Sequence, residues 1–497
     1  MTTAVVVGSG PNGLAAAVFL AREGVEVTVL EAADTIGGGT RTSELTPGLL
    51  HDHCSATHPM AVGSPFLRSL DLGRHGLTWC LPDIDCAHPL DSGDAGVLHR
   101  SVEKTADGLG EMDGRRWRRM FQPLADGYDA LAEDLMRPLA HLPRHPLRLA
   151  AFGPWALLPT AATARLWRSE SARALFAGVA AHAFRPFDRP ASAAIGLTII
   201  AAGHRHGWPV AAGGSRAIGD ALAARLTEFG GRIETGVRVR SEADLPPADV
   251  VLFDLAPRAV ADILGDRLPR RVARAYRRYR HGPGAFKVDF AVQDGVPWTN
   301  EAARRAGTVH LGGNYAEVAA GERAIHTGRM PERPFVLVGQ QYLADPQRSK
   351  GDVHPVWTYA HVPHGYDGDA TEAVVAQIER FAPGFRERVL DLAVRPPAGF
   401  EEYNPNYVGG DIVAGANTAF QLVMRPRAAL DPYSTGVPGM YICSAATPPG
   451  AGAHGMCGAN AAASALRGLR GLRGLRGLRG LRGLRGLRGL RGLRGLR

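Results

Sequence analysis

The sequence predicts an α/β protein, α+β overall, in which a Rossmann-like dinucleotide-binding domain is interleaved with a second, mixed α/β domain. Three observations favour this fold class: a glycine-rich motif between two apolar runs at the N-terminus, a second glycine-rich loop near the C-terminus, and two long segments between them. With 497 residues, of which 45% are hydrophobic, the chain is long enough for two domains with sizeable cores.

The N-terminal motif has the order of a βαβ unit that holds a dinucleotide. The apolar run 4–7 leads into Gly8, Gly10 and Gly13, which have G-x-G-x-x-G spacing, and a second apolar run ends at Glu31. The first glycine permits a tight turn, the second lets the backbone approach the pyrophosphate, and the third lets the helix pack on the sheet. An acid about twenty residues further on accepts hydrogen bonds from ribose hydroxyls. We therefore predict that these glycines and Glu31 bind a dinucleotide.

The residues after Glu31 favour FAD over NAD. A simple NAD-binding unit would run from its second strand into another helix, whereas this chain has a glycine cluster, 37–39, followed by Arg41. Such a loop can lie across a pyrophosphate and flavin, with Arg41 as the counter-charge. The arrangement resembles the start of the amine oxidase and phytoene desaturase superfamily of flavoproteins. In that superfamily the double glycine belongs to the FAD site, which implies the same role for Gly38.

The C-terminal glycine loop is predicted to complete that one site. Gly450, Gly452 and Gly455 also have G-x-G-x-x-G spacing, but the preceding strand ends several residues too early and no second strand with an acid follows. A second nucleotide site is therefore not supported. The resemblance to the same superfamily implies that Gly452 and Gly455 face the flavin ring and the ribityl chain.

A middle segment is expected to return to the nucleotide-binding domain. Residues 213–222 are a glycine turn that opens a helix, and residues 230–239 give two short strands. Val239 matches the position at which related flavoproteins place a backbone group against the adenine. An ordinary β-α-β piece of the sheet explains the segment equally well.

At finer grain the chain resembles the phytoene-desaturase-like branch formed by bacterial relatives of pyridine nucleotide-disulphide oxidoreductase domain-containing protein 2. The resemblance covers nearly the whole chain before the C-terminal repeat. The matching stretches are 52–59, 282–289, 379–385, 404–411 and 447–460. Residues 240–250 are shorter than the usual β-meander of the superfamily. Because the chain has no Cys-x-x-Cys, disulphide reductase chemistry is not supported.

These signals predict two interleaved domains and a tail. Residues 1–75, 207–265 and 430–466 would form the FAD-binding domain, and residues 76–206 and 266–429 would form the substrate domain. A substrate would meet the flavin in the crevice between the domains, which is a usual place for a ligand pocket.

The tail, residues 467–497, belongs to a Gly-Leu-Arg repeat. A period of three spreads the leucines around a helix, and each glycine costs about 1 kcal/mol relative to alanine. We expect a disordered tail that either has no role or binds an anionic membrane or nucleic acid weakly through its charge. Residues 466–497 hold eleven arginines, and removing them turns the net charge from +9 into −2.

The sequence favours a cytoplasmic protein. The N-terminus enters a strand at once, the five cysteines are odd in number, and no run of about eighteen apolar residues occurs. Two apolar stretches, 150–166 and 191–202, have three explanations. They line a substrate tunnel, dip into a membrane surface and make the protein peripheral there, or pack in the core.

His58 and His454 are the candidates for proton transfer, because both lie in motif segments expected near the flavin ring. A structural role is the alternative for each. Two His-x-His pairs, at 51–53 and 204–206, lack a third ligand in a recognisable pattern, so no metal is expected.

The leading function is that of an FAD-dependent oxidoreductase of the dehydrogenase or desaturase type. It would transfer a hydride from a hydrophobic, isoprenoid-like substrate to flavin N5. The alternatives are a flavin-dependent isomerase without net oxidation and a flavoprotein with a regulatory or binding role. The sequence leaves the substrate, the electron acceptor and the oligomeric state open.

Overall fold

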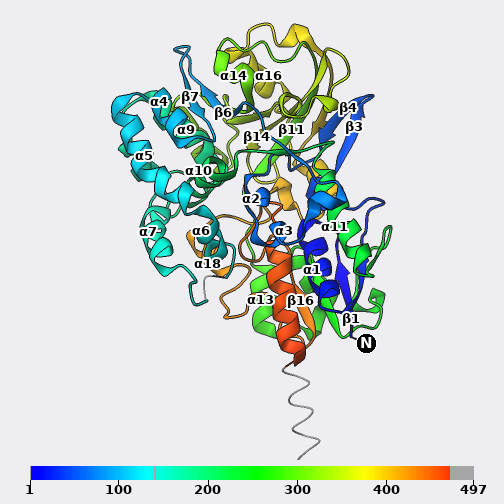
Figure 1. The fold of residues 1–497 in the computed structure, drawn as a ribbon. Helices are drawn as coiled ribbons and strands as arrows, with labels where there is room; N and C mark the ends of the chain where they lie inside the picture. The colour runs from blue at the N-terminus through cyan, green and yellow to red at the C-terminus, as the bar shows by residue number, and fades with distance from the viewer. Residues whose placement is uncertain (1, 139–140, 471–497) are drawn as a thin grey trace, which may run out of the picture.

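The computed structural model describes residues 2–138 and 141–470, and two β-sheets form its framework (Figure 1). The smaller sheet has five parallel strands in the order β16-β10-β1-β2-β9. Its strands are β1 (Thr3–Val7), β2 (Glu26–Leu30), β9 (Arg232–Glu234), β10 (Val250–Phe253) and β16 (Met440–Ile442). Three distant parts of the chain therefore meet in one parallel sheet.

Helices cover both faces of this sheet, because successive side chains of a strand point to opposite faces. Ala4 and Val6 belong to one buried cluster, whereas Val5 and Val7 belong to another. The first cluster includes residues of α1 (Pro11–Arg22), α11 (Arg216–Glu228) and the helix at 456–470. The second includes residues of α12 (Pro257–Leu264) and α13 (Arg270–Arg277). The result is a doubly wound, Rossmann-like domain.

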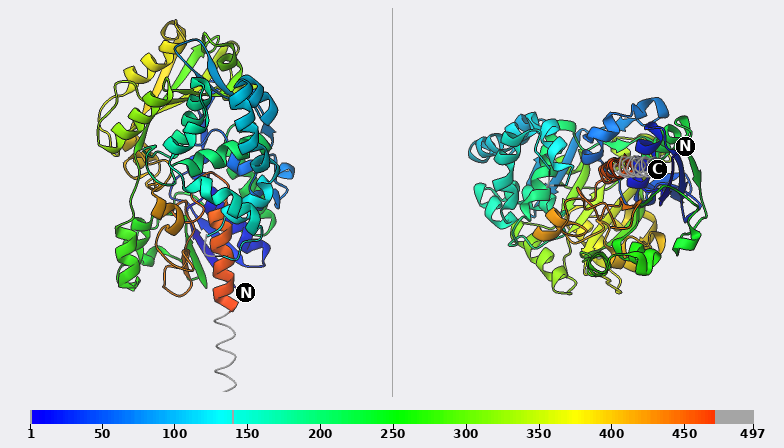
Figure 2. Two further views of the ribbon diagram at one scale, coloured as in Figure 1. Left: turned by 90° about the vertical axis from the view of Figure 1, so that its left-hand side faces the viewer. Right: turned by 90° about the horizontal axis from the view of Figure 1, so that it is seen from below.

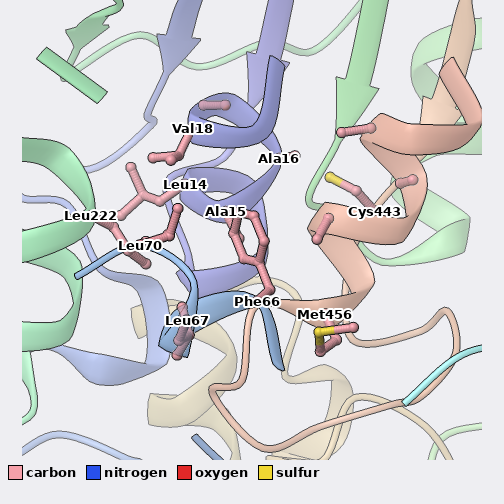
Figure 3. Packing of buried hydrophobic residues seen from close by; sticks show 14 of the residues in the cluster. Leu14, Ala15, Ala16, Val18, Phe66, Leu67, Leu70, Leu222, Cys443 and Met456 are labelled. Carbon is pink, nitrogen blue, oxygen red and sulfur yellow. The ribbon is translucent and has the colours of Figure 1, made fainter. Parts of the chain in front are cut away.

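The C-terminal helix, residues 456–470, lies directly against α1 (Figures 2 and 3). A Cβ on Gly458 would lie 1.8 Å from the carbonyl oxygen of Asn12, so glycine is required at this contact. Residues 467–470 continue this helix, and Leu469 packs against the core. The prediction of disorder from residue 467 is therefore wrong for 467–470. The remainder of the predicted tail, 471–497, lies outside the described residues.

The larger sheet has seven strands in the order β15-β11-β14-β13-β12-β6-β7, and only β12 and β6 run parallel. Its strands are β6 (Ile84–Pro89), β7 (Ala95–Leu98), β11 (Gly284–Gln293), β12 (Ala306–Leu311), β13 (Val336–Gly339), β14 (Val353–Val362) and β15 (Val389–Arg395). One face packs on α14 (Glu301–Arg305) and α16 (Thr371–Phe381), and α9 (Glu170–Ala181) and α15 (Tyr315–His326) pack on the other side.

A helical lobe lies beside the larger sheet (Figure 1). It has its own buried cluster, which includes Trp117 and Trp208. Its helices are α4 (Val102–Gly108), α5 (Glu111–Asp126), α6 (Tyr128–Leu135), α7 (Pro146–Leu157) and α10 (Ala193–His206). The shorter elements elsewhere are β3 (Thr42–Thr46), β4 (Leu49–Asp52), β5 (Trp79–Cys80), β8 (Val210–Ala211), α2 (Pro59–Val62), α3 (Pro65–Arg68), α8 (Thr160–Thr163), α17 (Pro397–Tyr403) and α18 (Ala419–Met424).

The predicted fold class is confirmed, whereas the predicted domain bounds stay predictions. One detail differs, because residues 230–239 contain the single strand β9 rather than two strands. Among the described residues, no helix is both long enough and apolar enough to cross a membrane.

Candidate functional site

The loop between β1 and α1 depends on glycine at three positions. Gly8 has a φ of +100°, a left-handed conformation that other residues rarely adopt. A Cβ on Gly10 would lie 2.6 Å from Oδ2 of Asp254, and a Cβ on Gly13 would lie 2.1 Å from the carbonyl oxygen of Gly8. The loop can therefore bring backbone N–H groups and the N-terminus of α1 to an anion such as a pyrophosphate.

Glu31 follows β2 beside this loop, and both of its carboxylate oxygens have protein partners. Oε2 accepts hydrogen bonds from the backbone N and the Oγ of Ser9, at 2.9 and 2.5 Å. Oε1 accepts from the backbone N of Ala33 at 2.9 Å and from Nη2 of Arg41 at 3.3 Å. The two predicted cofactor residues Glu31 and Arg41 thus form an ion pair with each other.

Asp254 lies under the glycine loop, and the sequence argument missed it. Its Oδ2 accepts a hydrogen bond from the backbone N of Gly13 at 2.9 Å. Burial raises the pKa of Asp254 to about 7, opposed by the Gly13 N–H and reinforced by the charge of Glu31. The available signal was the apolar run 250–253 ending in an acid, as the run before Glu31 does.

A groove of about 390 Å³ runs along this loop and takes in most of the predicted cofactor residues. The predicted residues that line it are Gly8, Gly10, Glu31, Gly38, Arg41 and Val239. Gly13 lies beneath the loop rather than in the groove lining. Backbone N–H groups, a carboxylate and open space beside the glycines are what a dinucleotide requires, so the residues present fit FAD.

A larger cavity of about 680 Å³ adjoins the groove, and apolar side chains form most of its lining. Pro11, Gly39 and Tyr407 line both spaces. Gly452 lines the larger cavity, as a residue facing the flavin ring would. Gly455 does not, because it lies against α1, where a Cβ would be 2.8 Å from the Cβ of Ala15.

His58 and His454 are buried beside the larger cavity but do not line it. Nε2 of His58 lies 2.8 Å from Oγ of Ser215, and Nδ1 of His454 accepts a hydrogen bond from the backbone N of Met456 at 3.1 Å. Burial lowers the pKa of both imidazoles to about 4. These contacts give both residues structural roles, and their roles in proton transfer stay predictions.

His182, which the sequence argument did not single out, lines the larger cavity at the C-terminal end of α9. Its Nε2 lies 3.0 Å from Nε2 of His310 on β12. Burial lowers the pKa of His182 to about 3, so the imidazole is neutral near pH 7. Its signal in the sequence was weak, because it is an isolated histidine in an alanine-rich helix.

Both His-x-His pairs are used within the protein. Oγ of Ser43 lies 2.6 Å from Nε2 of His53, and Nε1 of Trp117 donates to Nε2 of His204 at 2.9 Å. In the part of the chain that the structure describes, no group of three or more His, Cys, Asp or Glu side chains is arranged to hold a metal ion.

Comparison with known proteins adds to this geometry. Residues 6–70 match the family model of the NAD(P)-binding Rossmann-like domain. The chain is 26% identical over 541 residues to pyridine nucleotide-disulfide oxidoreductase domain-containing protein 2 of Mus musculus, with 92% of each chain covered. It is 26% identical over 488 residues to hydroxyneurosporene desaturase of Cereibacter sphaeroides, with 90% of this chain and 94% of the desaturase covered.

Solved structures share the fold at low sequence identity. An oxidoreductase from Methanosarcina mazei has a TM-score of 0.60 and 17% identity, with 94% of this chain and 100% of that chain covered. Wild-type putrescine oxidase bound to putrescine has a TM-score of 0.59 and 16% identity, with 95% and 99% covered. A fatty acid isomerase from P. acnes that produces CLA has a TM-score of 0.54 and 15% identity, with 93% and 98% covered.

The parallel sheet with its glycine loop, the acid after the second strand and the adjoining cavity define an FAD-dependent oxidoreductase, in agreement with these relatives. Within that class, these relatives support the predicted FAD-dependent amine oxidase and phytoene desaturase superfamily, to which the chain is similar over nearly its whole length. The predicted enzyme class and cofactor are confirmed.

Proposed function

We propose that the protein is a dehydrogenase or desaturase that oxidises a hydrophobic, isoprenoid-like small molecule. The observation that carries the proposal is the larger cavity, which is mainly apolar and adjoins the nucleotide groove. Such a lining favours an apolar substrate, because removing apolar surface from water contributes roughly 25 cal/mol per Å². The similarity to hydroxyneurosporene desaturase over 90% of this chain supports a desaturase.

The residues of the chain position the substrate and keep water away. Leu337, Trp357 and Tyr359 of the larger sheet form one wall of the cavity, and Ile195 and Ile199 of α10 form another. FAD, when bound, supplies the hydride acceptor at its N5 atom. The protein side of the reaction is therefore orientation and desolvation of the reacting carbon.

A desaturation also releases a proton, and His182 is a candidate acceptor in the cavity lining. Its imidazole is neutral near pH 7 and so has a ring nitrogen without a proton, but burial, which lowers its pKa to about 3, makes it a weak base. His310, 3.0 Å away, would orient the ring. His58 and His454 also remain candidates for proton transfer, although neither lines the cavity. The electron acceptor that reoxidises the enzyme is proposed to be a separate, unidentified partner.

A flavin-dependent isomerase is the second candidate. The fold is shared with the P. acnes fatty acid isomerase at a TM-score of 0.54, and an apolar cavity serves an isomerase as well as a desaturase. The two reactions differ in electron balance, because the desaturase converts oxidised flavin to reduced flavin in one anaerobic turnover, whereas an isomerase leaves the oxidation state of the flavin unchanged.

An anaerobic screen of apolar alkenes and isoprenoids against the FAD-loaded protein tests the proposal. We expect loss of the visible flavin absorbance with a formed double bond. A product with an unchanged level of oxidation, formed only by reduced enzyme, would identify the isomerase. Ala194→Trp, which adds bulk to the cavity lining, should slow bleaching about tenfold or more. Ala224→Trp on the exposed side of α11 is the matched control. Equal rates in the two variants would remove the cavity from the substrate path.

The cavity lining also favours a peripheral position at a membrane, because a substrate of this kind partitions into lipid. In Figure 1, α7 lies at the outer edge of the helical lobe, and residues of both α7 and α18 contribute to that lining.

A further inference from the structure

Two arginines carry the charge in the lining of the larger cavity. The lining includes Arg137 and Arg425 and, among the described residues, no Asp or Glu. Arg137 is partly buried, whereas Arg425 is only 1% exposed. His182 adds no charge near pH 7, because burial lowers its pKa to about 3. The cavity is therefore mainly apolar but carries positive charge at Arg425.

The guanidinium of Arg425 is held in place by three uncharged acceptors. Arg425 directly follows α18, and its Nε donates a hydrogen bond to the carbonyl oxygen of Gln421 in that helix at 3.0 Å. Its Nη1 donates to the carbonyl oxygen of Ala445 at 3.2 Å, and its Nη2 donates to Oδ1 of Asn417 at 2.9 Å. These three bonds fix the plane of the guanidinium before any ligand binds.

Arg425 has no counter-ion in the part of the chain that the structure describes. None of its three hydrogen-bond partners is a carboxylate. Asp411, a buried acid earlier in the same segment, accepts hydrogen bonds from the backbone N–H groups of Gly282, Val413 and Gly415 instead. A buried charge without a partner is costly, so an anion that enters the cavity would be stabilised beside Arg425.

The donors that remain on Arg425 fit a carboxylate. A guanidinium has five N–H groups, and the three bonds above leave one on Nη1 and one on Nη2. Two N–H groups of one guanidinium fork can donate to the two oxygens of a single carboxylate. Gly450, which also lines the cavity, leaves space at this point, because a Cβ there would lie 2.8 Å from Nη1.

We propose that the larger cavity takes a hydrophobic molecule that ends in a carboxylate, and that Arg425 binds this carboxylate. The apolar walls would take the remainder of the molecule. The proposal deepens the proposed function and rests on it only for the oxidation step. An amine is disfavoured, because a cation would meet arginine and no acid in this lining. A phosphate is disfavoured, because its additional oxygens need more donors than the two that remain on Arg425.

The first test compares four probes that share one isoprenoid chain and differ in the end group: farnesoic acid, methyl farnesoate, farnesol and farnesylamine. Each is titrated into the full-length, FAD-loaded protein near pH 7, where the acid is ionised, and the dissociation constant is measured by calorimetry. We expect the acid to bind about tenfold or more tightly than the ester and the alcohol, and the amine to bind most weakly. Equal affinity for the acid and the alcohol would overturn the proposal without any variant.

The second test is Arg425→Gln, which removes the charge and keeps a side chain that can form hydrogen bonds. It should weaken binding of farnesoic acid about tenfold or more and leave the affinity for farnesol unchanged. Arg427→Gln is the matched control. Arg427 also donates to backbone carbonyl oxygens, those of Asp431 and Ser434, but it does not line the cavity. This control should retain the full preference for the acid.

Arg425 also joins neighbouring segments, so FAD content and melting temperature are measured for each variant. An equal loss of affinity for acid and alcohol in Arg425→Gln would mean that Arg425 supports the cavity wall rather than the ligand, and would overturn the proposal. If that variant does not retain FAD, Arg425→Lys decides. It should show a smaller but measurable acid preference, because an ammonium keeps the charge and lacks the planar fork. An undiminished preference in Arg425→Lys would overturn the two-oxygen contact.

Anaerobic bleaching of the flavin separates this proposal from the proposed function. Tight binding of the acid without bleaching by any isoprenoid acid would overturn the proposed function alone. Bleaching with the same kcat/KM for an acid and its alcohol would overturn the carboxylate site alone.

Discussion

Replacement of Glu31 by alanine tests the nucleotide groove at its most specific contact. A hydrogen bond to a charged group contributes roughly 1.5–3 kcal/mol, so loss of the carboxylate should weaken FAD binding about 10- to 150-fold. The carboxylate is buried and lies in the groove lining, where the predicted ribose contact requires it. The dissociation constant of FAD, measured by titrating the cofactor-free protein, reports this loss.

Glu31→Ala should also lower the stability of the cofactor-free protein, which loss of a ribose contact alone would not do. Glu31 accepts hydrogen bonds from the backbone N–H groups of Ser9 and Ala33 and from Arg41. Because Ser9 is fully buried, its unpaired N–H should cost about 1–3 kcal/mol in the cofactor-free protein. That corresponds to a fall of several degrees in melting temperature. Glu31→Ala should therefore weaken both FAD binding and the empty fold.

Two further variants separate these effects. Glu31→Gln keeps the shape and one acceptor oxygen, so it should retain more stability than affinity. Glu234→Ala is the control, since Glu234 ends the neighbouring strand β9 and its side chain is half exposed. It should change neither quantity. A Glu31→Ala protein with an unchanged FAD dissociation constant and a lowered melting temperature would refute the ribose contact and leave Glu31 a structural residue.

Three other outcomes are expected. A chain ending at Arg470 should keep FAD and its melting temperature. A chain ending at Ala465 should have a lower melting temperature, because it loses the partly buried Leu466 and Leu469. Equal melting temperatures of the two chains would contradict the packing of the last helical turn. The cofactor-free protein should lose stability as the pH falls from 6.5 toward 4. Burial lowers the pKa of His58 and of His454 to about 4, so the unfolded chain binds more protons, worth about 1 kcal/mol per pH unit and group. Asp254, whose pKa burial raises to about 7, has the opposite effect on stability, but buried imidazoles with a lowered pKa outnumber buried carboxyls with a raised one. A urea midpoint that rises between pH 7 and 5 would contradict the expectation. NADH and NADPH should not bleach the flavin rapidly at micromolar concentration, because only one glycine loop has a Rossmann unit around it; fast anaerobic reduction by either would show a nicotinamide site.

The nucleotide-binding part of the fold was predictable because its signals are local. Gly8, Gly10, Gly13 and Glu31 lie within one βαβ unit, and each answers a requirement of that unit alone. Asp254 was not predictable in the same way. Its hydrogen bond to Gly13 joins residues 241 positions apart, and only the pairing of β10 with β1 brings them together.

The cavity lining was harder to predict than the groove, because a motif gives the position of a residue but not the direction of its side chain. Thr57 and Pro59 line the cavity, yet His58 between them points away and meets Ser215. Ala453 also lines the cavity, whereas His454 does not. The same uncertainty applied to the apolar stretch 150–166, whose residues divide between cavity lining, core and exposed surface.

The glycine cluster after Glu31 shows how one loop serves two spaces. Gly38 lines the nucleotide groove, and its carbonyl oxygen accepts a hydrogen bond from the hydroxyl of Tyr403 at 2.5 Å. Gly39 lines both the groove and the larger cavity, and a Cβ there would lie 2.0 Å from the hydroxyl oxygen of Tyr407. The absence of a side chain at residue 39 therefore lets Tyr407, from the second half of the chain, close on the loop. This contact lies at the boundary where a substrate in the larger cavity would meet the cofactor. Gly38 therefore stays a predicted cofactor residue, and the structure adds Gly39 as the position that lets the two spaces join.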